Sequence, residues 1–260
     1  MSLKGRTALV TGSTSGIGLG IARALAAQGV NVMLNGFGEA GAIADLLTEF
    51  RAMGVQAAHD GADLMQQGGA AGLVSRTQAT LGSLEILVNN AGIQHTATIA
   101  DFPPEKWDAV IALNLTAPFL CMQAAIPGMV KAGWGRIINI ASAHGLVASA
   151  QKAAYVAAKH GLLGLTKVGA IELANTGVTV NAICPGWVLT PLVQAQIDRR
   201  AADSGQSVEA VGHTLLTEKQ PMAQFTTPEG LGGLAVFLCS EAARTMTGVP
   251  LSMDGGWTAQ

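Results

Sequence analysis

The chain contains a single tyrosine, Tyr155, and a lysine, Lys159, follows it four residues later in a segment with a helical pattern. Side chains at positions i and i+4 of a helix lie on one face, about one turn apart. A free tyrosine has a pKa near ~10, and a neighbouring ammonium favours the phenolate and lowers that pKa. The pair therefore indicates a general base that accepts an alcohol proton while hydride leaves the carbon, and that returns the proton in reduction.

A half-buried surface pair without chemistry is the alternative interpretation of Tyr155 and Lys159. Ser142 argues against it, because this serine ends the strand-like run Arg136–Ser142 just before the pair. Open α/β sheets form their sites at the carboxyl ends of their strands. We therefore expect Ser142, Tyr155 and Lys159 to meet at one site.

A glycine-rich turn follows the first apolar run. The run Thr7–Thr11 leads into TGSTSGIGLGIA, where Gly12, Gly16 and Gly18 precede a helical pattern. Glycine lets the turn close and lets backbone N–H groups approach a phosphate, to which a helix N-terminus adds partial positive charge. A turn that only packs is the alternative, but its place between the first strand and the first helix favours dinucleotide binding.

Apolar runs alternate with helical patterns along the chain. The strand-like runs are Thr7–Thr11, Val30–Leu34, Val55–Ala58, Ile86–Asn89, Arg136–Ser142, Val178–Ile183 and Pro250–Met253. The helical segments are Gly18–Gln28, Ala40–Met53, Gly69–Thr80, Glu105–Lys131, Lys152–Asn175 and Pro228–Ser240. Continuous Val/Ile/Leu runs are typical of parallel strands that are covered on both faces. The pattern predicts one α/β domain over residues 1–260, a Rossmann-type, doubly wound parallel sheet of about seven strands. Residues 189–224, polar and rich in Ala and Gln, interrupt the alternation and are expected to form a substrate lid.

The composition excludes several classes of protein. With 49% hydrophobic residues, 12% charged residues and a net charge of −2, the chain has no basic surface for nucleic acid. Three scattered cysteines indicate neither a disulfide framework nor a zinc site, so a reduced, cytoplasmic location is expected. The uncharged stretch Ala109–Val130 is long enough to span a bilayer, but its Asn114, Thr116, Gln123 and two prolines favour a buried helix, and we expect no membrane association.

These motifs together resemble the short-chain dehydrogenase/reductase family. The resemblance lies in the glycine loop, in NNAG at Asn89–Gly92, in Ser142 with Tyr-x-x-x-Lys, and in PGWVLT at Pro185–Thr190. It implies that Ser142 hydrogen-bonds the substrate oxygen, that Lys159 also binds the nicotinamide ribose, and that Asn114 supports a proton-relaying water. Asn114 taken alone would equally fit a structural role in its helix. No metal is required, because nicotinamide carries the hydride.

The resemblance also implies a set of cofactor-binding residues. They are Gly12, Thr14, Ser15, Gly16, Ile17, Gly18, Phe37, Asp63, Leu64, Asn90, Ala91, Gly92, Tyr155, Lys159, Pro185, Gly186, Val188 and Thr190. Asp63 would contact adenine, although a helix cap is as good an interpretation. The second strand ends in LNGFG without the acid typical of NAD enzymes, but no Arg or Lys stands there for a 2′-phosphate. NAD is therefore the predicted cofactor, with Asn35 and the backbone of Gly36 and Phe37 available to the ribose.

Several polar side chains near these motifs suit a small carboxylate substrate. His144, Lys152, Gln94 and His95 neighbour the catalytic motifs, and the insertion offers Gln194 and Gln196. One lysine with amide and imidazole donors can hold a carboxylate. Segments such as NNAGIQHT, KAAYVAAKHG, EKQP and DGGWTA resemble one group within the family, the bacterial D-3-hydroxybutyrate dehydrogenases. That resemblance implies substrate contacts from Gln94, Ser142, His144, Lys152, Tyr155, Trp187, Gln196 and Trp257, and oxidation of (R)-3-hydroxybutyrate to acetoacetate by NAD.

Each of the substrate residues also has an ordinary structural interpretation, and two other functions stay open. One is an NADPH-dependent 3-oxoacyl or acetoacetyl-CoA reductase of the same family, which would usually carry a basic residue in the glycine loop. The other is a non-catalytic dinucleotide sensor, which would not need the Asn114, Ser142, Tyr155 and Lys159 set. The family resemblance, rather than the composition, implies a homotetramer. In it the apolar helices expected at Glu105–Lys131 and Lys152–Asn175 pair between subunits.

Overall fold

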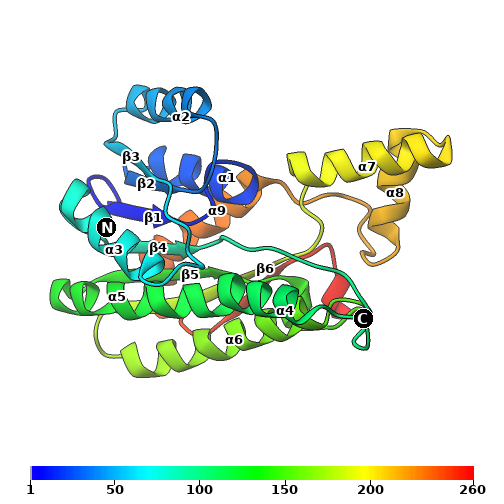
Figure 1. Cartoon of the computed structure of the whole chain (residues 1–260). Coiled ribbons are helices and arrows are strands. Elements are labelled where there is room, and N and C mark those ends of the chain that lie inside the picture. Colours follow the sequence, from blue (N-terminus) through cyan, green and yellow to red (C-terminus); the bar gives the residue numbers. More distant parts are fainter. Residues whose placement is uncertain (1) are drawn as a thin grey trace.

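The computed structural model describes residues 2–260 and contains a central sheet in which every strand pair is parallel (Figure 1). Within these residues the seven strands lie in the order β3-β2-β1-β4-β5-β6-β7. Their bounds are β1 Thr7–Val10, β2 Asn31–Asn35, β3 Ala57–Asp60, β4 Ile86–Asn89, β5 Gly135–Ile140, β6 Val178–Pro185 and β7 Pro250–Met253. The order reverses between β1 and β4, and this switch point is where doubly wound sheets bind their ligands.

Helices cover both faces of the sheet. They are α1 Gly16–Ala26, α2 Ala40–Ala52, α3 Gly69–Leu81, α4 Pro104–Ile111, α5 Ala117–Ala132, α6 Ala153–Leu173, α7 Pro191–Ser204, α8 Val208–Thr217 and α9 Pro228–Cys239. In Figure 1, α1, α2 and α9 lie on one side of the sheet, and α4, α5 and α6 lie on the other. The fold class expected from the sequence is confirmed.

The strands consist of continuous apolar runs because successive residues pack into the hydrophobic cores on opposite faces of the sheet. Val10 and Val88 pack with the α1, α2 and α9 layer, whereas Leu9 and Leu87 pack with the α3, α5 and α6 layer. Successive strand side chains point to opposite faces, so a sheet covered on both sides needs apolar residues at every position. The run of β5 behaves in the same way, with Ile138 in the first core and Ile137 in the second.

The insertion at residues 189–224 is largely helical, which the sequence analysis did not predict. Thr190 caps α7 by accepting a hydrogen bond from the Val193 N–H at 3.3 Å, and Ser207 caps α8 through the Ala210 N–H at 3.1 Å. The two helices share a small core of Ile197, Ala201, Val211 and Leu215. The two helices pack mainly on each other and stand off the sheet (Figure 1). Their outer faces are therefore polar, and the short apolar pattern was not recognised in the sequence.

The apolar stretch that includes Ala109–Val130 forms one continuous helical segment, Pro104–Ala132, with a π-helical turn at Ala112–Thr116. By length and composition this segment could cross a membrane, with a mean hydropathy of 1.8, and 39% of its most apolar window is buried. Its inner side, including Cys121, Ala125 and Met129, belongs to the second core. The segment packs against α3 and β5, as the sequence analysis expected of a buried helix.

Candidate active site

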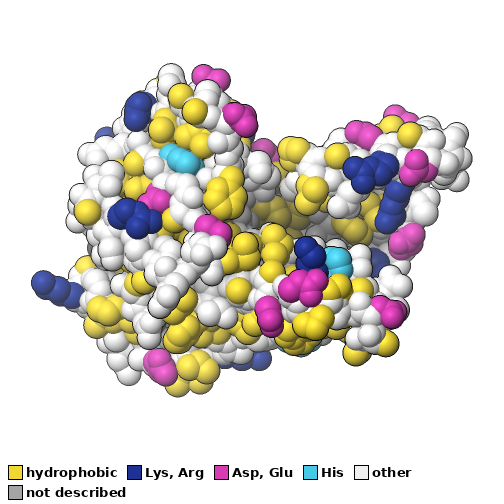
Figure 2. Space-filling model, viewed as in Figure 1, with side chains coloured by type: hydrophobic (Ala, Val, Ile, Leu, Met, Phe, Trp, Pro, Cys, Tyr) yellow, Lys and Arg dark blue, Asp and Glu magenta, His cyan; other side chains and the backbone are white. Residues whose placement is uncertain are grey.

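A cleft of about 920 Å³ runs along the carboxyl ends of the strands. In Figure 2 the molecule is hollowed between its main body and the segment formed by α7 and α8. The predicted site residues that line the cleft are Gly12, Thr14, Ser15, Gly16, Ile17, Phe37, Asp63, Leu64, Asn90, Ala91, Gly92, Gln94, Asn114, Ser142, His144, Lys152, Tyr155, Lys159, Pro185, Gly186, Trp187, Val188, Thr190, Gln196 and Trp257. One continuous cavity therefore brings the predicted catalytic, cofactor and substrate residues together.

The glycine loop forms one wall of this cleft at the start of α1. Gly12 and Gly16 have φ angles of +61° and +56°, which favour glycine, and the first N–H groups of a helix lack partners inside it. Gly18 does not line the cleft, and its predicted cofactor contact stays a prediction. A Cβ at Gly18 would lie 2.4 Å from the Gly12 carbonyl oxygen, so glycine is needed there for packing of the loop on the helix.

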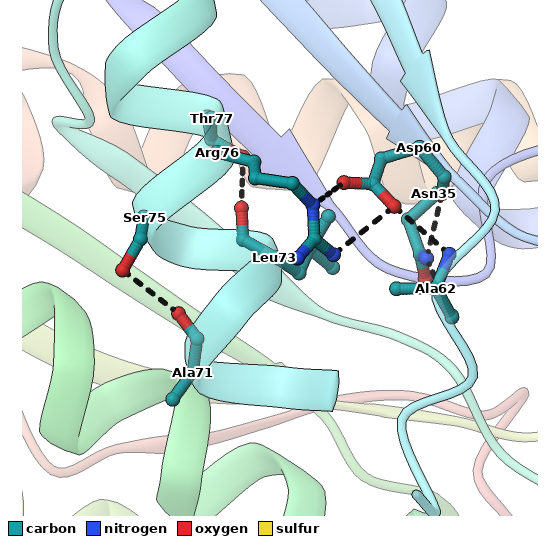
Figure 3. A network of polar contacts seen from close by, with 8 residues as sticks. All are labelled: Asn35, Asp60, Ala62, Ala71, Leu73, Ser75, Arg76 and Thr77. Carbon is teal, nitrogen blue, oxygen red and sulfur yellow. Dashed lines mark hydrogen bonds and ion pairs between the residues drawn. The ribbon is translucent and has the colours of Figure 1, made fainter. Parts of the chain in front are cut away.

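At the end of β2, the side chain of Asn35 is part of the framework. Its amide donates to the Asp60 and Ala62 carbonyls at 2.9 and 3.1 Å, as Figure 3 shows. Asp60 accepts from the Ala62 N–H at 2.9 Å and pairs with the Arg76 guanidinium at 2.5 Å. These bonds from Arg76 and Ala62 hold the pKa of the Asp60 carboxyl below its usual value, although burial acts against them. The amide of Asn35 is thus committed to the protein, and Arg76 is already paired with Asp60.

Asp63 and Phe37 also line this end of the cleft. Asp63 accepts from the Met65 N–H at 2.9 Å in a local turn, and Gly68 stands at the N-cap of α3, so the helix-cap interpretation of Asp63 is wrong. The carbonyl of Phe37 accepts from the Thr14 hydroxyl at 2.9 Å, while the ring of Phe37 is 70% exposed. Phe37 therefore offers one exposed apolar side chain at this end of the cleft.

Tyr155 and Lys159 project from the first turns of α6 toward the end of β5. The Lys159 ammonium donates to the Ile140 carbonyl at 2.7 Å and lies 5.5 Å from the centroid of the Tyr155 ring. Burial lowers the pKa of Lys159 to about 8. Burial also raises the pKa of Tyr155, while the Ser142 hydroxyl acts in the opposite direction. The expectation that the ammonium lowers the tyrosine pKa is therefore wrong for the net shift, because the desolvation of the phenol outweighs the other contributions.

Asn114 lies inside the π-helical turn and is completely buried. Its amide nitrogen donates to the Ile93 and Val110 carbonyls, both at 2.9 Å. The nitrogen of this side chain therefore has the structural role that the sequence analysis gave as the alternative. Its Oδ1 has no hydrogen-bond partner among the described residues and faces Gly92, where a Cβ would lie 2.5 Å from Oδ1 and 3.8 Å from the Lys159 nitrogen. A buried acceptor aimed at this narrow space beside Lys159 is suited to hold a water.

The opposite end of the cleft is lined by aromatic rings and by Lys152. Trp187 and Trp257 stack with their ring centroids 6.4 Å apart, and His144 meets Trp257 edge-on at 5.0 Å. The Lys152 nitrogen lies 5.9 Å from the Trp187 centroid. Burial, followed by the positive charge of Lys152, lowers the pKa of His144 to about 4, and its Nε2 lies 3.0 Å from the Ser149 hydroxyl. Near neutral pH this end therefore offers a neutral imidazole beside an ammonium.

Two residues proposed for this region lie elsewhere. His95 packs edge-on against Phe102, with centroids 5.4 Å apart. Gln194 donates to Asp198 at 2.8 Å and lines a separate cavity between α7 and α8. The structure also adds apolar lining residues that sequence reasoning missed, Ile93, Leu113, Met65, Leu192 and Val193. Such residues carry no chemical signal in the sequence, because the same types fill the core.

The sequence and the fold both match known proteins. Residues 6–201 match the family model described as short chain dehydrogenase. The chain belongs to the short chain dehydrogenase family. D-beta-hydroxybutyrate dehydrogenase of Cupriavidus necator is 59% identical over 258 residues, 99% of this chain and 100% of that protein. A protein of the same name from Rhizobium meliloti is 50% identical, over 98% of this chain and 99% of its own length.

Among solved structures, L-sorbose reductase from Gluconobacter frateurii, complexed with NADPH and L-sorbose, is similar across 100% of both chains. The TM-score is 0.94 at 30% sequence identity. The chain is accordingly an oxidoreductase of the short chain dehydrogenase family, as the resemblance of its motifs implied.

Proposed function

We propose that the protein oxidises (R)-3-hydroxybutyrate to acetoacetate, reversibly, with NAD as hydride acceptor. The single observation that carries this proposal is the position of Lys152, His144 and the two stacked tryptophans in the same cleft as Tyr155 and Ser142. A compact pocket with one ammonium suits a short chain that carries a carboxylate near the reacting alcohol. Two relatives named D-beta-hydroxybutyrate dehydrogenase, at 59% and 50% identity, support the same substrate.

The residues present fit a nicotinamide dinucleotide. The positive φ angles of Gly12 and Gly16 shape a loop whose N–H groups can hold the pyrophosphate at the start of α1. By family resemblance, Tyr155 and Lys159 would hold the nicotinamide ribose, and the segment Pro185–Thr190 would flank the nicotinamide. When bound, this group supplies the acceptor for the substrate hydride.

The charges along the cleft support NAD rather than NADP. Among the described residues that line the cleft, the cations are Lys152 and Lys159, and both lie in the catalytic and substrate part. Near the end of β2, Arg76 is paired with Asp60. A 2′-phosphate would therefore meet no available guanidinium or ammonium there. NADPH stays the alternative, because the solved L-sorbose reductase was complexed with it.

In the proposed mechanism the Lys152 ammonium holds the carboxylate, with Gln94, His144 and Gln196 as further polar contacts. The Ser142 hydroxyl donates to the substrate oxygen. The Tyr155 oxygen accepts the hydroxyl proton as the hydride leaves, and it donates that proton in reduction. Lys159, with the water that Oδ1 of Asn114 is suited to hold, passes the proton onward from Tyr155. In total the substrate loses one hydride and one proton, which converts its secondary alcohol to a ketone.

The organisation around this site is part of the proposal. Residues 1–260 act as one catalytic domain, with the segment 189–224 as a lid over the substrate end. Exposed apolar side chains on α5 and α6, including Phe119 at 45% and Ile171 at 77% exposure, support pairing of these helices between subunits of a homotetramer. The proposed location is the cytoplasm, with no membrane or nucleic-acid partner.

The experiment that tests the function is NADH formation by the purified protein with (R)- and (S)-3-hydroxybutyrate. Turnover of the (R) acid with NAD supports the proposal. Turnover only of acetoacetyl-CoA or 3-oxoacyl carriers with NADPH would establish the reductase alternative. Binding of NAD without turnover of any hydroxy acid would instead favour a dinucleotide sensor.

A further inference from the structure

Gln220 follows α8 in the segment Glu218–Pro221, and no step of the proposed mechanism uses it. Its side chain is 1% exposed, which is unusual for a glutamine next to an exposed turn. A buried primary amide needs acceptors for two N–H bonds and a donor for its oxygen. The partners of this amide therefore show what the residue holds in place.

The amide of Gln220 joins the end of the lid segment to the loop that carries Trp187. Its Oε1 accepts from the Trp187 backbone N–H at 2.6 Å. Its Nε2 donates to the Gln224 carbonyl at 3.2 Å and approaches the Met222 carbonyl at 3.5 Å. One side chain thus ties the irregular segment after α8 to the wall of the cleft.

Two glycines make room for this amide. A Cβ at Gly186 would lie 2.5 Å from Oε1 of Gln220, and a Cβ at Gly255 would lie 2.7 Å from its Nε2. Gly186 directly precedes Trp187, and Gly255 stands two residues before Trp257. The amide is therefore packed between the two loops that present the stacked tryptophans to the cleft.

The consequence concerns the substrate end of the site. The indoles of Trp187 and Trp257 touch the residues assigned to the carboxylate, since Lys152 lies over Trp187 and His144 meets Trp257. Displacement of either loop would move this wall. The glycine loop between β1 and α1 lies outside this wall, so cofactor binding should change less than substrate binding, although Pro185–Thr190 would also flank the nicotinamide.

We propose that Gln220 is a positioning residue that holds Trp187 and Trp257 against the substrate carboxylate site and anchors the C-terminal end of the lid. The identity of the substrate in this inference rests on the proposed function. The positioning itself rests on the hydrogen bonds and close approaches of the amide.

The test compares Gln220→Met, which keeps the length of the side chain but removes the hydrogen bonds, with Gln206→Met at an exposed position between α7 and α8. We expect Gln220→Met to raise the KM for (R)-3-hydroxybutyrate about tenfold and to raise the Kd for NADH by a clearly smaller factor. Gln220→Glu keeps the oxygen that faces the Trp187 N–H but places its second oxygen against the Gln224 and Met222 carbonyls, so it should raise KM as well. Gln206→Met should change neither constant.

Acrylamide quenching of tryptophan fluorescence provides a readout that needs no turnover. Greater quenching in Gln220→Met than in Gln206→Met supports the inference, because Trp187 and Trp257 would be less tightly held. Unchanged quenching and KM would overturn it. A parallel rise of KM and of the Kd for NADH would also overturn it, since that result indicates a general structural role. If the wild-type protein does not oxidise (R)-3-hydroxybutyrate, the proposed function fails, and the quenching comparison still decides the role of Gln220.

Discussion

The Lys159 ammonium lies 5.5 Å from the centroid of the Tyr155 ring and is hydrogen-bonded to the Ile140 carbonyl at 2.7 Å. Burial raises the pKa of Tyr155 and lowers the pKa of Lys159 to about 8. A general base works only when deprotonated, so kcat/KM for oxidation should rise with pH across the alkaline range, and reduction should weaken there. Rate profiles in both directions check this expectation. An oxidation rate that falls between neutral pH and pH 9 would contradict it.

Tyr155→Phe should lower kcat for oxidation by about 10³-fold, because the substrate proton loses its acceptor. NADH binding, measured by fluorescence titration, should change little, since the ring and its packing are retained. A variant with wild-type turnover would remove Tyr155 from the role of general base.

Lys152→Ala should raise the KM for the hydroxy acid about tenfold or more while the Kd for NADH stays near its wild-type value, because only the carboxylate loses a charged partner. The matched control is Lys167→Ala, which removes an exposed lysine from the C-terminal half of α6, away from the cleft. Equal effects of the two substitutions would show that net charge, rather than the position of Lys152, affects substrate binding.

His144 should make the protein less stable in mild acid. Its pKa is about 4 in the folded protein against 6.5 in a free histidine, so the unfolded chain binds a proton first as the pH falls. The free energy of unfolding should therefore decrease between pH 6.5 and pH 4, by at most about 3 kcal/mol from this group. Denaturant titrations of the wild type and of His144→Gln check this, and the substitution should flatten the curve in that range. The same slope in both proteins would contradict the assignment.

Much of the fold was predictable because its signals are local. The apolar runs at Ile86–Asn89 and Pro250–Met253 match β4 and β7 to the residue, and the glycine turn lies where the first strand meets the first helix. The α7 and α8 helices were missed, since their shared core is only a few residues wide. Sequence spacing alone gives no measure of burial.

The same limits apply to the site. Residues that carry chemistry, such as Ser142 and Lys152, were identified by type and context, and the structure brings them into one cleft. Gly18 shows a further limit, because a glycine that packs and a glycine that touches a phosphate look alike in a motif. The raised pKa of Tyr155 was also missed, because desolvation depends on the whole fold rather than on the neighbour at i+4. His95 and Gln194 show that proximity in sequence does not direct a side chain into a pocket.

The most direct test of the proposed function is the initial rate of NADH formation with (R)-3-hydroxybutyrate and NAD, measured beside the (S) acid and beside the (R) acid with NADP. We predict turnover of the (R) acid with NAD, and rates at least about 100-fold lower in the other two reactions, because the pocket orients one alcohol face and offers no cation to a 2′-phosphate. Absence of turnover with the (R) acid and NAD, or equal rates with NADP, would contradict the proposal.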